Sequence, residues 1–207
     1  MTRELAVIGD IHGNSAALTG MLRLLNRWRG SLVFTGDYVN RGPDSAGVIQ
    51  VLIELSASGR ETYFVAGNHD RAFYDAVTTG KLFPLLSMGG AVAIKSYVED
   101  PKGNVGQQLR ESVPQSHIEF LGGLLPLFEC DGLAVTHRWN DPVPERLSDH
   151  YRVYGHSPTA DRKPRIGTRS AAIDTGCGLS TDGPLTCFLW PMRTAMQVDA
   201  HGVQITT

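Results

Sequence analysis

The fold is decided by the stretch from Leu5 to Asp70, in which three glycine-led motifs follow apolar runs: Gly9-Asp10-Ile11-His12-Gly13, Gly36-Asp37-Tyr38-Val39-Asn40-Arg41-Gly42, and Gly67-Asn68-His69-Asp70. The preceding runs, at residues 5–8, 32–34 and 63–65, have the length and composition of short buried strands. Helix-length segments separate them, and right-handed crossovers make such strands parallel and bring the loops that follow them to one sheet edge. The sequence therefore predicts that the polar side chains of the three motifs converge.

The two segments between these runs carry helix signals. Asn14 or Ser15 can cap a helix whose apolar residues recur at three- and four-residue spacing. Asp44 or Ser45 can cap a second helix of the same kind. We predict that the apolar faces of both helices pack on the sheet.

The pattern of the chain changes at about residue 125. Residues 71–125 are rich in helix formers but interrupted by glycine and proline, which predicts a cap made of several helices. From Phe128 onwards, apolar or alternating runs separated by Gly, Pro and Asp predict the strands of a second sheet, at residues 133–135, 152–154, 170–173, 185–189 and 195–198. No repeat or long linker divides the chain, so we expect one α/β domain over residues 1–207.

Composition and charge exclude several classes of protein. The 19 Lys and Arg residues against 21 Asp and Glu residues give a net charge of −2, which offers no general attraction to a nucleic-acid duplex or an anionic membrane. Three cysteines without a Cys-X-X-Cys spacing argue against a disulfide framework and against a thiolate zinc site. With neither a basic leader nor an apolar run of about 18 residues, a cytoplasmic protein is expected.

Two of the later predicted strands end in histidine, at His137 and His156. Carboxylate, amide and imidazole ligands suit a pair of divalent transition ions, and a two-metal phosphoesterase needs one group shared between ions roughly 3.5–4 Å apart. The ligands that we assign are Asp10, His12 and Asp37 for one ion, and Asp37, Asn68, His137 and His156 for the other. Asp37 would bridge the ions, and a bridging water with a lowered pKa would supply the hydroxide that attacks phosphorus in line.

Taken together, the motifs resemble those of a known family. GDIHG, GDYVNRG, GNHD, the strand-end His137 and GHSPT at residues 155–159 are similar to the phosphoprotein phosphatase branch of the calcineurin-like metallophosphoesterases. That branch includes serine/threonine phosphatases and symmetrically cleaving diadenosine tetraphosphatases. The resemblance implies a four-layer α/β fold, with a central β-sandwich of two mixed sheets flanked by helices. It also implies the ligands assigned above, with manganese as the expected metal and iron, zinc or nickel as alternatives.

The same resemblance implies three catalytic roles. Arg41 corresponds to the phosphate-binding arginine of the family, and His69 to the histidine that protonates the leaving oxygen. Where the protein phosphatases have an aspartate that raises the pKa of this histidine, the chain has Asn40. An amide can orient the ring but adds no charge, so His69 would be a weaker proton donor. A nucleoside diphosphate is a better leaving group than a serine alkoxide and needs less protonation, which favours an anhydride substrate.

Other departures from the family leave alternatives open. Only about twenty residues separate His137 from His156, too few for the insertion that carries a second phosphate-binding arginine in many phosphatases. Arg138, Arg146 and Arg152 are candidates to replace it. The substrate could be a phosphoprotein, a phosphorylated small molecule or a dinucleoside tetraphosphate, and a non-catalytic metal-binding scaffold is the alternative outside the enzymes.

Overall fold

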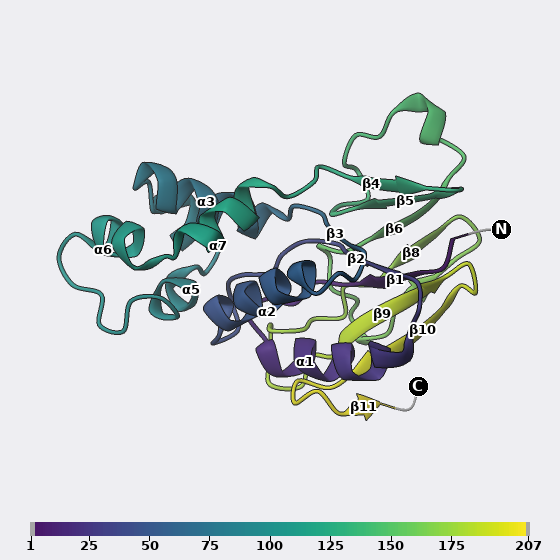
Figure 1. Cartoon of the computed structure of the whole chain (residues 1–207), viewed down its shortest axis with the longest axis horizontal. Helices are drawn as coiled ribbons and strands as arrows, with labels where there is room; N and C mark the ends of the chain where they lie inside the picture. The colour runs from purple at the N-terminus through teal and green to yellow at the C-terminus, as the bar shows by residue number, and fades with distance from the viewer. Residues whose placement is uncertain (1–2, 206–207) are drawn as a thin grey trace.

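A computed structural model describes residues 3–205 of the chain, and its first sheet is built from the predicted strand, helix, strand order (Figure 1). The strands β1 (Leu5–Ile8), β2 (Ser31–Phe34) and β3 (Thr62–Phe64) pair in parallel, as predicted. The third strand ends one residue early, because Val65 makes only an isolated bridge to Leu125. Three antiparallel strands, β9 (Leu185–Trp190), β10 (Thr194–Val198) and β11 (Gln204–Ile205), extend the sheet to the order β11-β10-β9-β1-β2-β3.

The placement of β9 and β10 corrects one prediction, since we expected residues 185–189 and 195–198 in the second sheet. Both strands belong to the first sheet, where Leu5 pairs with Trp190 and Ile8 with Cys187. All six residues of β9 are buried, which requires cover on both faces and an interior position in the sheet. Strand periodicity shows that a run is buried but not which strand pairs with it.

The second sheet has the order β4-β5-β6-β8-β7. Its central strands, β5 (Leu133–Thr136), β6 (Tyr151–Tyr154) and β8 (Ser170–Ala172), are parallel to one another. The edge strands β4 (Phe128–Cys130) and β7 (Arg165–Ile166) run antiparallel to their neighbours. The prediction of two mixed sheets with flanking helices is thus confirmed.

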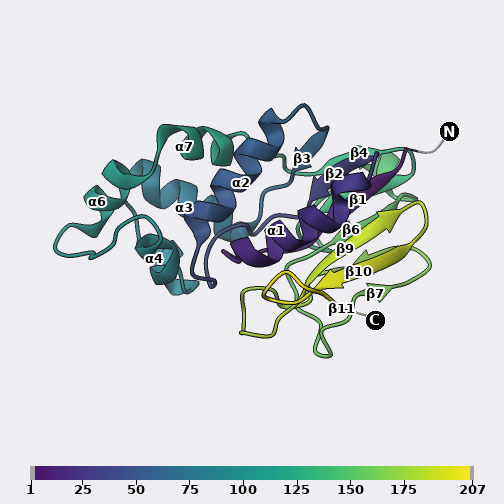
Figure 2. The same ribbon diagram turned by 60° about the horizontal axis from the view of Figure 1, so that its bottom comes forward.

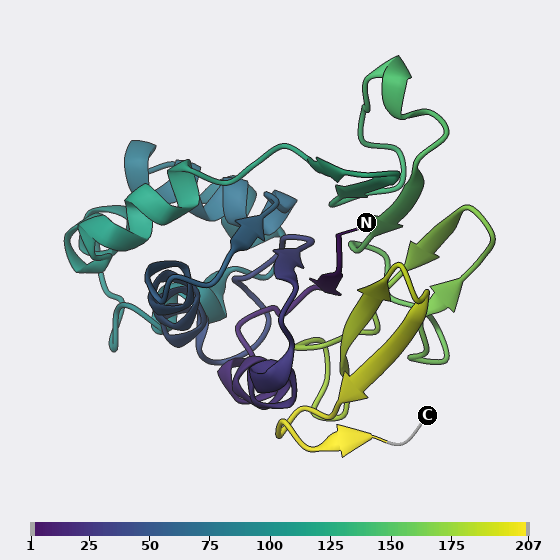
Figure 3. The ribbon, with the colours of Figure 1, turned by 45° about the vertical axis from the view of Figure 1, so that its right-hand side comes forward.

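The side chains of β1 show how the layers are held together. Leu5 and Val7 point into a core between the two sheets, whereas Ala6 and Ile8 point into a second core beneath the helices. This alternation is the two-residue period of a strand covered on both faces. Burying a side chain such as Leu or Val stabilises the folded state by about 1.5–3 kcal/mol relative to leaving it exposed. Figure 3 shows the helices gathered on one side and the two sheets on the other.

Two crossover helices, α1 (Ser15–Leu24) and α2 (Ser45–Ala57), cover the first sheet. Asn14 caps α1 by accepting the Ala17 amide, and Asp44 caps α2 by accepting the Gly47 amide. After Leu24 the chain tightens into a 3₁₀ turn, η1 (Leu25–Arg27). The guanidinium of Arg60 donates to the carbonyl oxygens of Leu25 and Trp28, which satisfies backbone acceptors left beyond the end of α1.

The helical segment lies beside the sandwich in Figure 1 and contains five helices: α3 (Asn68–Thr79), α4 (Phe83–Ser87), α5 (Ala91–Lys95), α6 (Val105–Ser112) and α7 (Gln115–Gly122). Gly80 ends α3 with a φ of 76°, in the left-handed region that glycine favours. Helix α7 packs on α2 and α3, which ties the segment to the sandwich. Within residues 3–205, no helix is long and apolar enough to span a bilayer.

Candidate metal centre

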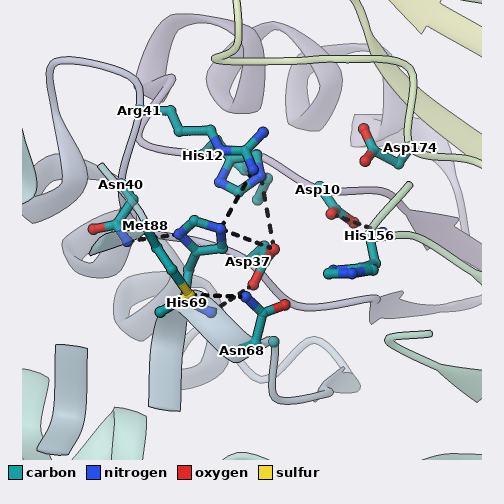
Figure 4. Close-up of polar contacts among 12 residues, drawn as sticks. Asp10, His12, Asp37, Asn40, Arg41, Asn68, His69, Met88, His156 and Asp174 are labelled. Atoms are coloured by element: carbon teal, nitrogen blue, oxygen red, sulfur yellow. Dashed lines mark hydrogen bonds and ion pairs between the residues drawn. The ribbon is translucent and has the colours of Figure 1, made fainter. Parts of the chain in front are cut away.

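The carboxyl ends of the parallel strands in both sheets meet, and the predicted metal ligands gather there together with the predicted acid His69 (Figure 4). Each arrives from a strand end or from the start of the next helix: Asp10 and His12 after β1, Asp37 after β2, Asn68 and His69 at the start of α3, His137 after β5, and His156 after β6. All of them are buried or half-buried. The convergence expected from the strand order is therefore present.

Asp37 lies at the centre of this group. Its Oδ2 atom is 3.3 Å from His137 Nε2, 3.7 Å from His12 Nε2 and 4.0 Å from His69 Nε2. Two clusters have ligand atoms within 4.8 Å of one another, and both contain Asp37: His12, Asp37 and His69, and Asp37, His137 and His156. A carboxylate shared by two clusters is the geometry needed to bridge two ions.

Asp10 belongs to neither cluster. Its Oδ1 accepts a hydrogen bond from the Thr35 hydroxyl at 3.0 Å, and its Oδ2 accepts the His156 amide at 2.9 Å. It is nonetheless buried within the same loop group, because Gly155 leaves room for its carboxylate where a side chain would collide. In this structure, Asp10 holds the loop of His156 against the end of β1.

The imidazole rings are oriented as metal ligands require. The Nδ1 atoms of His12 and His137 lie 3.1 and 3.0 Å from the carbonyl oxygens of Val39 and Thr35, so each Nδ1 donates its proton away from the site. Their Nε2 atoms then face Asp37 and can bind a metal. Asn68 turns its Oδ1 toward His137 and donates its Nδ2 proton to the sulfur of Met88. The buried Nδ1 of His156 has no protein partner in the described chain. These donors fit divalent transition ions.

Backbone strain is concentrated at this site. Seven non-glycine residues within positions 3–205 have a positive φ, and five of them are the site residues His12, Asp37, Asn40, Arg41 and His156. Each such residue costs on the order of 1–3 kcal/mol and persists only where the surroundings enforce it. The site loops are therefore held in one strained geometry by their neighbours.

Asp70 fixes the part of this geometry around Asp37, a structural role that the sequence did not predict. Its carboxylate accepts the amides of Asp37 and Tyr38 at 2.8 Å and that of Gly67 at 2.9 Å. Burial and then the charge of Asp37 raise the pKa of Asp70 to about 7, whereas these backbone bonds oppose the rise. Its position as the third residue of α3, where a carboxylate can reach back to the helix start, was the available sequence signal.

The buried charges of the site favour the binding of cations. Burial lowers the pKa of His12 to about 4. Burial also lowers the pKa of His137, but its hydrogen bond to Asp37 and the charge of that carboxylate outweigh this and raise it to about 9. Asp37 keeps a pKa well below its usual range, because His137 outweighs the effect of burial. Burial and the nearby Asp174 raise the pKa of Asp10, so added positive charge would relieve the repulsion between carboxylates.

Asn40 contacts His69 directly. Its Nδ2 lies 2.6 Å from His69 Nδ1, and its Oδ1 is buried without a protein partner among the described residues. If the amide donates to Nδ1, that nitrogen carries no proton, and a neutral His69 ring then has its proton on Nε2, which faces Asp37. Arg41 lies 3.4 Å from the same Nε2. Burial lowers the pKa of His69, and the charge of Arg41 adds to this effect against that of Asp37.

The three candidate arginines lie in different surroundings. Arg146 is paired with Glu129, and Arg152 stacks on the ring of Trp139 and donates to its carbonyl. The Arg138 side chain is half-buried and makes no hydrogen bond or ion pair within residues 3–205, although its Nε is buried. Burial is the main cause of the lowered pKa values of His69 and His156, and the charge of Arg138 adds to it in both, as expected for a guanidinium close to the metal ligands.

Comparison with known proteins identifies the family. The sequence model described as calcineurin-like phosphoesterase matches residues 4–167. The chain belongs to the calcineurin-like phosphoesterase family. This membership supports a metal-dependent phosphoester hydrolase, and it confirms the resemblance found in the motifs.

Among its relatives are bis(5'-nucleosyl)-tetraphosphatases named PrpE and described as asymmetrical. The protein from Halalkalibacterium halodurans is 28% identical, and the alignment covers 89% of each chain. The protein from Oceanobacillus iheyensis is 23% identical, and the alignment covers 94% of this chain and 92% of the relative. Their names specify asymmetrical cleavage, whereas the motif resemblance pointed to enzymes that cleave symmetrically.

Two solved structures share the fold. A crystal structure of a putative diadenosine tetraphosphatase superimposes with a TM-score of 0.67 at 23% identity and covers 96% of this chain and 94% of its own. A cold-active protein-tyrosine phosphatase of a psychrophilic Shewanella species has a TM-score of 0.65 at 13% identity, covering 100% of this chain and 80% of its own. These similarities show the two-sheet fold.

Proposed function

We propose that this protein is a two-metal hydrolase of dinucleoside tetraphosphates, in which a nucleotide is the leaving group. The observation that carries the substrate assignment is the contact between Asn40 and His69, because a neutral amide stands where a charged partner would keep the histidine protonated. A phosphoanhydride tolerates this weaker acid better than an alkyl phosphomonoester does. The names of the relatives support the same substrate class.

The proposed ligands keep the assignment made from the sequence: Asp10, His12 and Asp37 for one ion, and Asp37, Asn68, His137 and His156 for the other. The clusters in the structure support His12, Asp37, His137 and His156, and the first cluster contains His69 where the assignment has Asp10. Divalent ions bound there would lower the pKa of water beside the phosphorus and so supply the nucleophile at neutral pH. The protein contributes the orientation of the rings, through Val39 and Thr35, and the dense negative charge around Asp37.

Arg41 and His69 serve the reacting phosphate. The Arg41 guanidinium reaches the His69 ring, so it can pair with phosphate oxygens at the same point. It would offset the charge that grows in the transition state. The Nε2 proton of His69 faces the site and can pass to the leaving oxygen.

Arg138 is proposed as the second phosphate-binding arginine. It is the candidate without a protein partner in the described residues, and its charge acts on two of the site histidines. Arg138→Ala should raise KM for diadenosine tetraphosphate, while Arg146→Ala, which removes a partner of the distant Glu129, should not. Equal effects of the two substitutions would contradict this role.

The proposed function is tested by parallel turnover of diadenosine tetraphosphate and a phosphoserine peptide, each with manganese and with a chelator. We expect a higher kcat/KM for the dinucleotide, loss of turnover in the chelator and recovery when manganese is restored. A preference for the phosphopeptide would contradict the substrate assignment. Turnover that is insensitive to the chelator would contradict the metal mechanism. If neither substrate is hydrolysed, the result would favour the alternative function, a non-catalytic metal-binding scaffold.

A further inference from the structure

A cavity of about 480 Å³ adjoins the metal centre at Arg41. Its walls come from four segments: the start of α1, the loop at residues 41–43, the loop at residues 178–181 and the turn at residues 200–201. The start of α1, the loop before β9 and the turn before β11 gather in the lower part of Figure 2. Arg41 lines this cavity and also lies 3.4 Å from His69, so one side chain joins the cavity to the proposed reaction site.

The chemistry of the walls differs from that of the metal centre. Among the described residues that line the cavity there is no carboxylate and no lysine, and Arg41 is the one fixed positive charge. Leu179, which is 42% exposed, and Pro43 supply apolar surface. Ser180 and Thr181 supply hydroxyl groups. A space of this size, with apolar surface and a few neutral polar groups, suits a small organic ligand better than a chain of phosphates or a cation.

Part of the cavity wall is fixed to the metal-binding loops. Gly178 has a φ of 73° and packs so closely on the His12 carbonyl that a side chain there would collide with it. The amides of Ser15 and Ala16 begin α1 and have no protein acceptor within residues 3–205, as expected for the first turn of a helix. Both residues line the cavity.

We propose that this cavity binds one nucleoside of the dinucleotide substrate, an inference that rests on the proposed function. The neutral polar groups would receive the ribose hydroxyls, and Leu179 and Pro43 would contact the base. Arg41, at the junction, would hold the phosphate that links this nucleoside to the reacting phosphorus. The cavity thus provides the part of substrate recognition that the phosphates alone do not supply.

The test fills the cavity from an exposed helical position. Ala16→Trp places a large ring in the space, and Thr181→Trp does so from the opposing loop. The readout is the KM for diadenosine tetraphosphate divided by the KM for 4-nitrophenyl phosphate, which has no nucleoside. We expect both substitutions to raise this ratio at least about tenfold, whereas the control Ala57→Trp, at an exposed position near the end of α2, leaves it unchanged.

A second readout isolates the nucleoside directly. ATP and methyl triphosphate carry the same singly esterified triphosphate chain, so their difference as inhibitors of 4-nitrophenyl phosphate hydrolysis reports the adenosine. ATP should inhibit more strongly in the wild type, and this advantage should disappear in both filled variants. An active wild type with no ATP advantage, or filled variants with an unchanged KM ratio, would overturn the subsite. A wild type that hydrolyses neither substrate with manganese would instead contradict the proposed function.

Discussion

The two sheets meet at one edge, but they hold their site residues in different ways. Loops from the first sheet are locked by the first sheet and α3 themselves, because Asp70 binds the amides around Asp37, whereas left-handed backbones occur in both halves, at His12 and Asp37 and at His156. The second-sheet ligands depend on the first sheet, since His137 bonds to the Thr35 carbonyl and the His156 amide donates to Asp10.

This difference assigns separate tasks to the two halves. The first sheet is the template that fixes the positions of both groups of ligands. The second sheet completes the coordination with His137 and His156, whose rings lie 5.0 Å apart. Substitutions of the first-half residues that fix these positions, Asp37 and Asp70, should therefore affect stability or metal binding together with catalysis. Substitutions in the second half should remove metal while leaving the fold in place.

The largest effect is expected at Asp37, where the two halves meet. Asp37→Asn removes the shared charge that the two ligand clusters require, so turnover should be abolished and metal content should fall. Hydrolysis of 4-nitrophenyl phosphate and elemental analysis measure the two effects. Asp149→Asn, at an exposed carboxylate paired with Arg169, is the matched control and should keep the turnover and the metal content of the wild type. Full activity in Asp37→Asn would refute the shared ligand.

Arg41→Ala should separate catalysis from metal binding within the first half. Because Arg41 contacts His69 but belongs to neither ligand cluster, both ions should remain bound. The loss of one preorganised donor should lower kcat by about 10²–10³-fold, or about 2.7–4 kcal/mol. Steady-state kinetics and elemental analysis of the same sample provide the comparison. A variant that loses its metal in proportion to its activity would show that Arg41 acts through the metal centre.

Asp70→Ala should destabilise the template itself. It leaves the buried amides of Asp37, Tyr38 and Gly67 without their acceptor, for which we expect a loss of about 3 kcal/mol in the free energy of unfolding. Asp44→Ala removes a single bond at the start of α2 and should cost about 1 kcal/mol. Urea unfolding of the metal-free proteins measures both. Equal losses would mean that Asp70 is no more than an ordinary helix cap.

The second half should respond to pH in the metal-free protein. Although burial opposes it, the pairing with Asp37 raises the pKa of His137 from 6.5 to about 9. The protonated His137, paired with Asp37, therefore stabilises the folded state fully below about pH 6.5. This contribution to the free energy of unfolding is lost as the pH rises through about 9. Metal must displace the same proton, so affinity for manganese should increase over this range. Urea unfolding and metal titration at several pH values test this, and a His137→Gln variant with the same pH slopes would refute it.

The smallest effect is expected from Asn40→Asp, which changes one atom beside His69. A carboxylate there should raise the pKa of His69 and favour its protonated form. Hydrolysis of an alkyl phosphomonoester should then increase relative to that of diadenosine tetraphosphate. The measurement is the ratio of the two kcat/KM values, since a change in folding or metal content would affect both substrates alike. An unchanged ratio would remove the leaving-group argument.

The sequence predicted the parts of the site that depend on local order. Asp10, Asp37 and Asn68 each follow an apolar run, so strand order alone brings them to one edge. Asp70 was missed as a structural residue because its acceptor role toward Asp37 joins positions 33 residues apart. The pairing of β9 with β1 was missed for the same reason, since burial of a strand does not name its partner.

The cavity beside Arg41 was also beyond the reach of sequence analysis. It is lined by residues from Gly13 to His201, and although Gly13, Arg41 and Gly42 belong to the glycine-led motifs, the wall segments at residues 178–181 and 200–201 carry no motif. Only the folded chain brings the start of α1 to the loop at residues 178–181. Asn40, in contrast, was identified from its motif, and the structure places it on His69 as the leaving-group argument requires.

The central claim, that the two sheets jointly hold two ions around Asp37, is tested most directly by counting manganese ions per chain in the wild type and in His137→Ala. The account predicts two ions in the wild type and one in His137→Ala, because the first-sheet ligands Asp10, His12 and Asp37 remain. His150→Ala, at a histidine outside the site, should retain two. A wild type that binds one ion or fewer, or a His137→Ala variant that keeps two, would contradict the account.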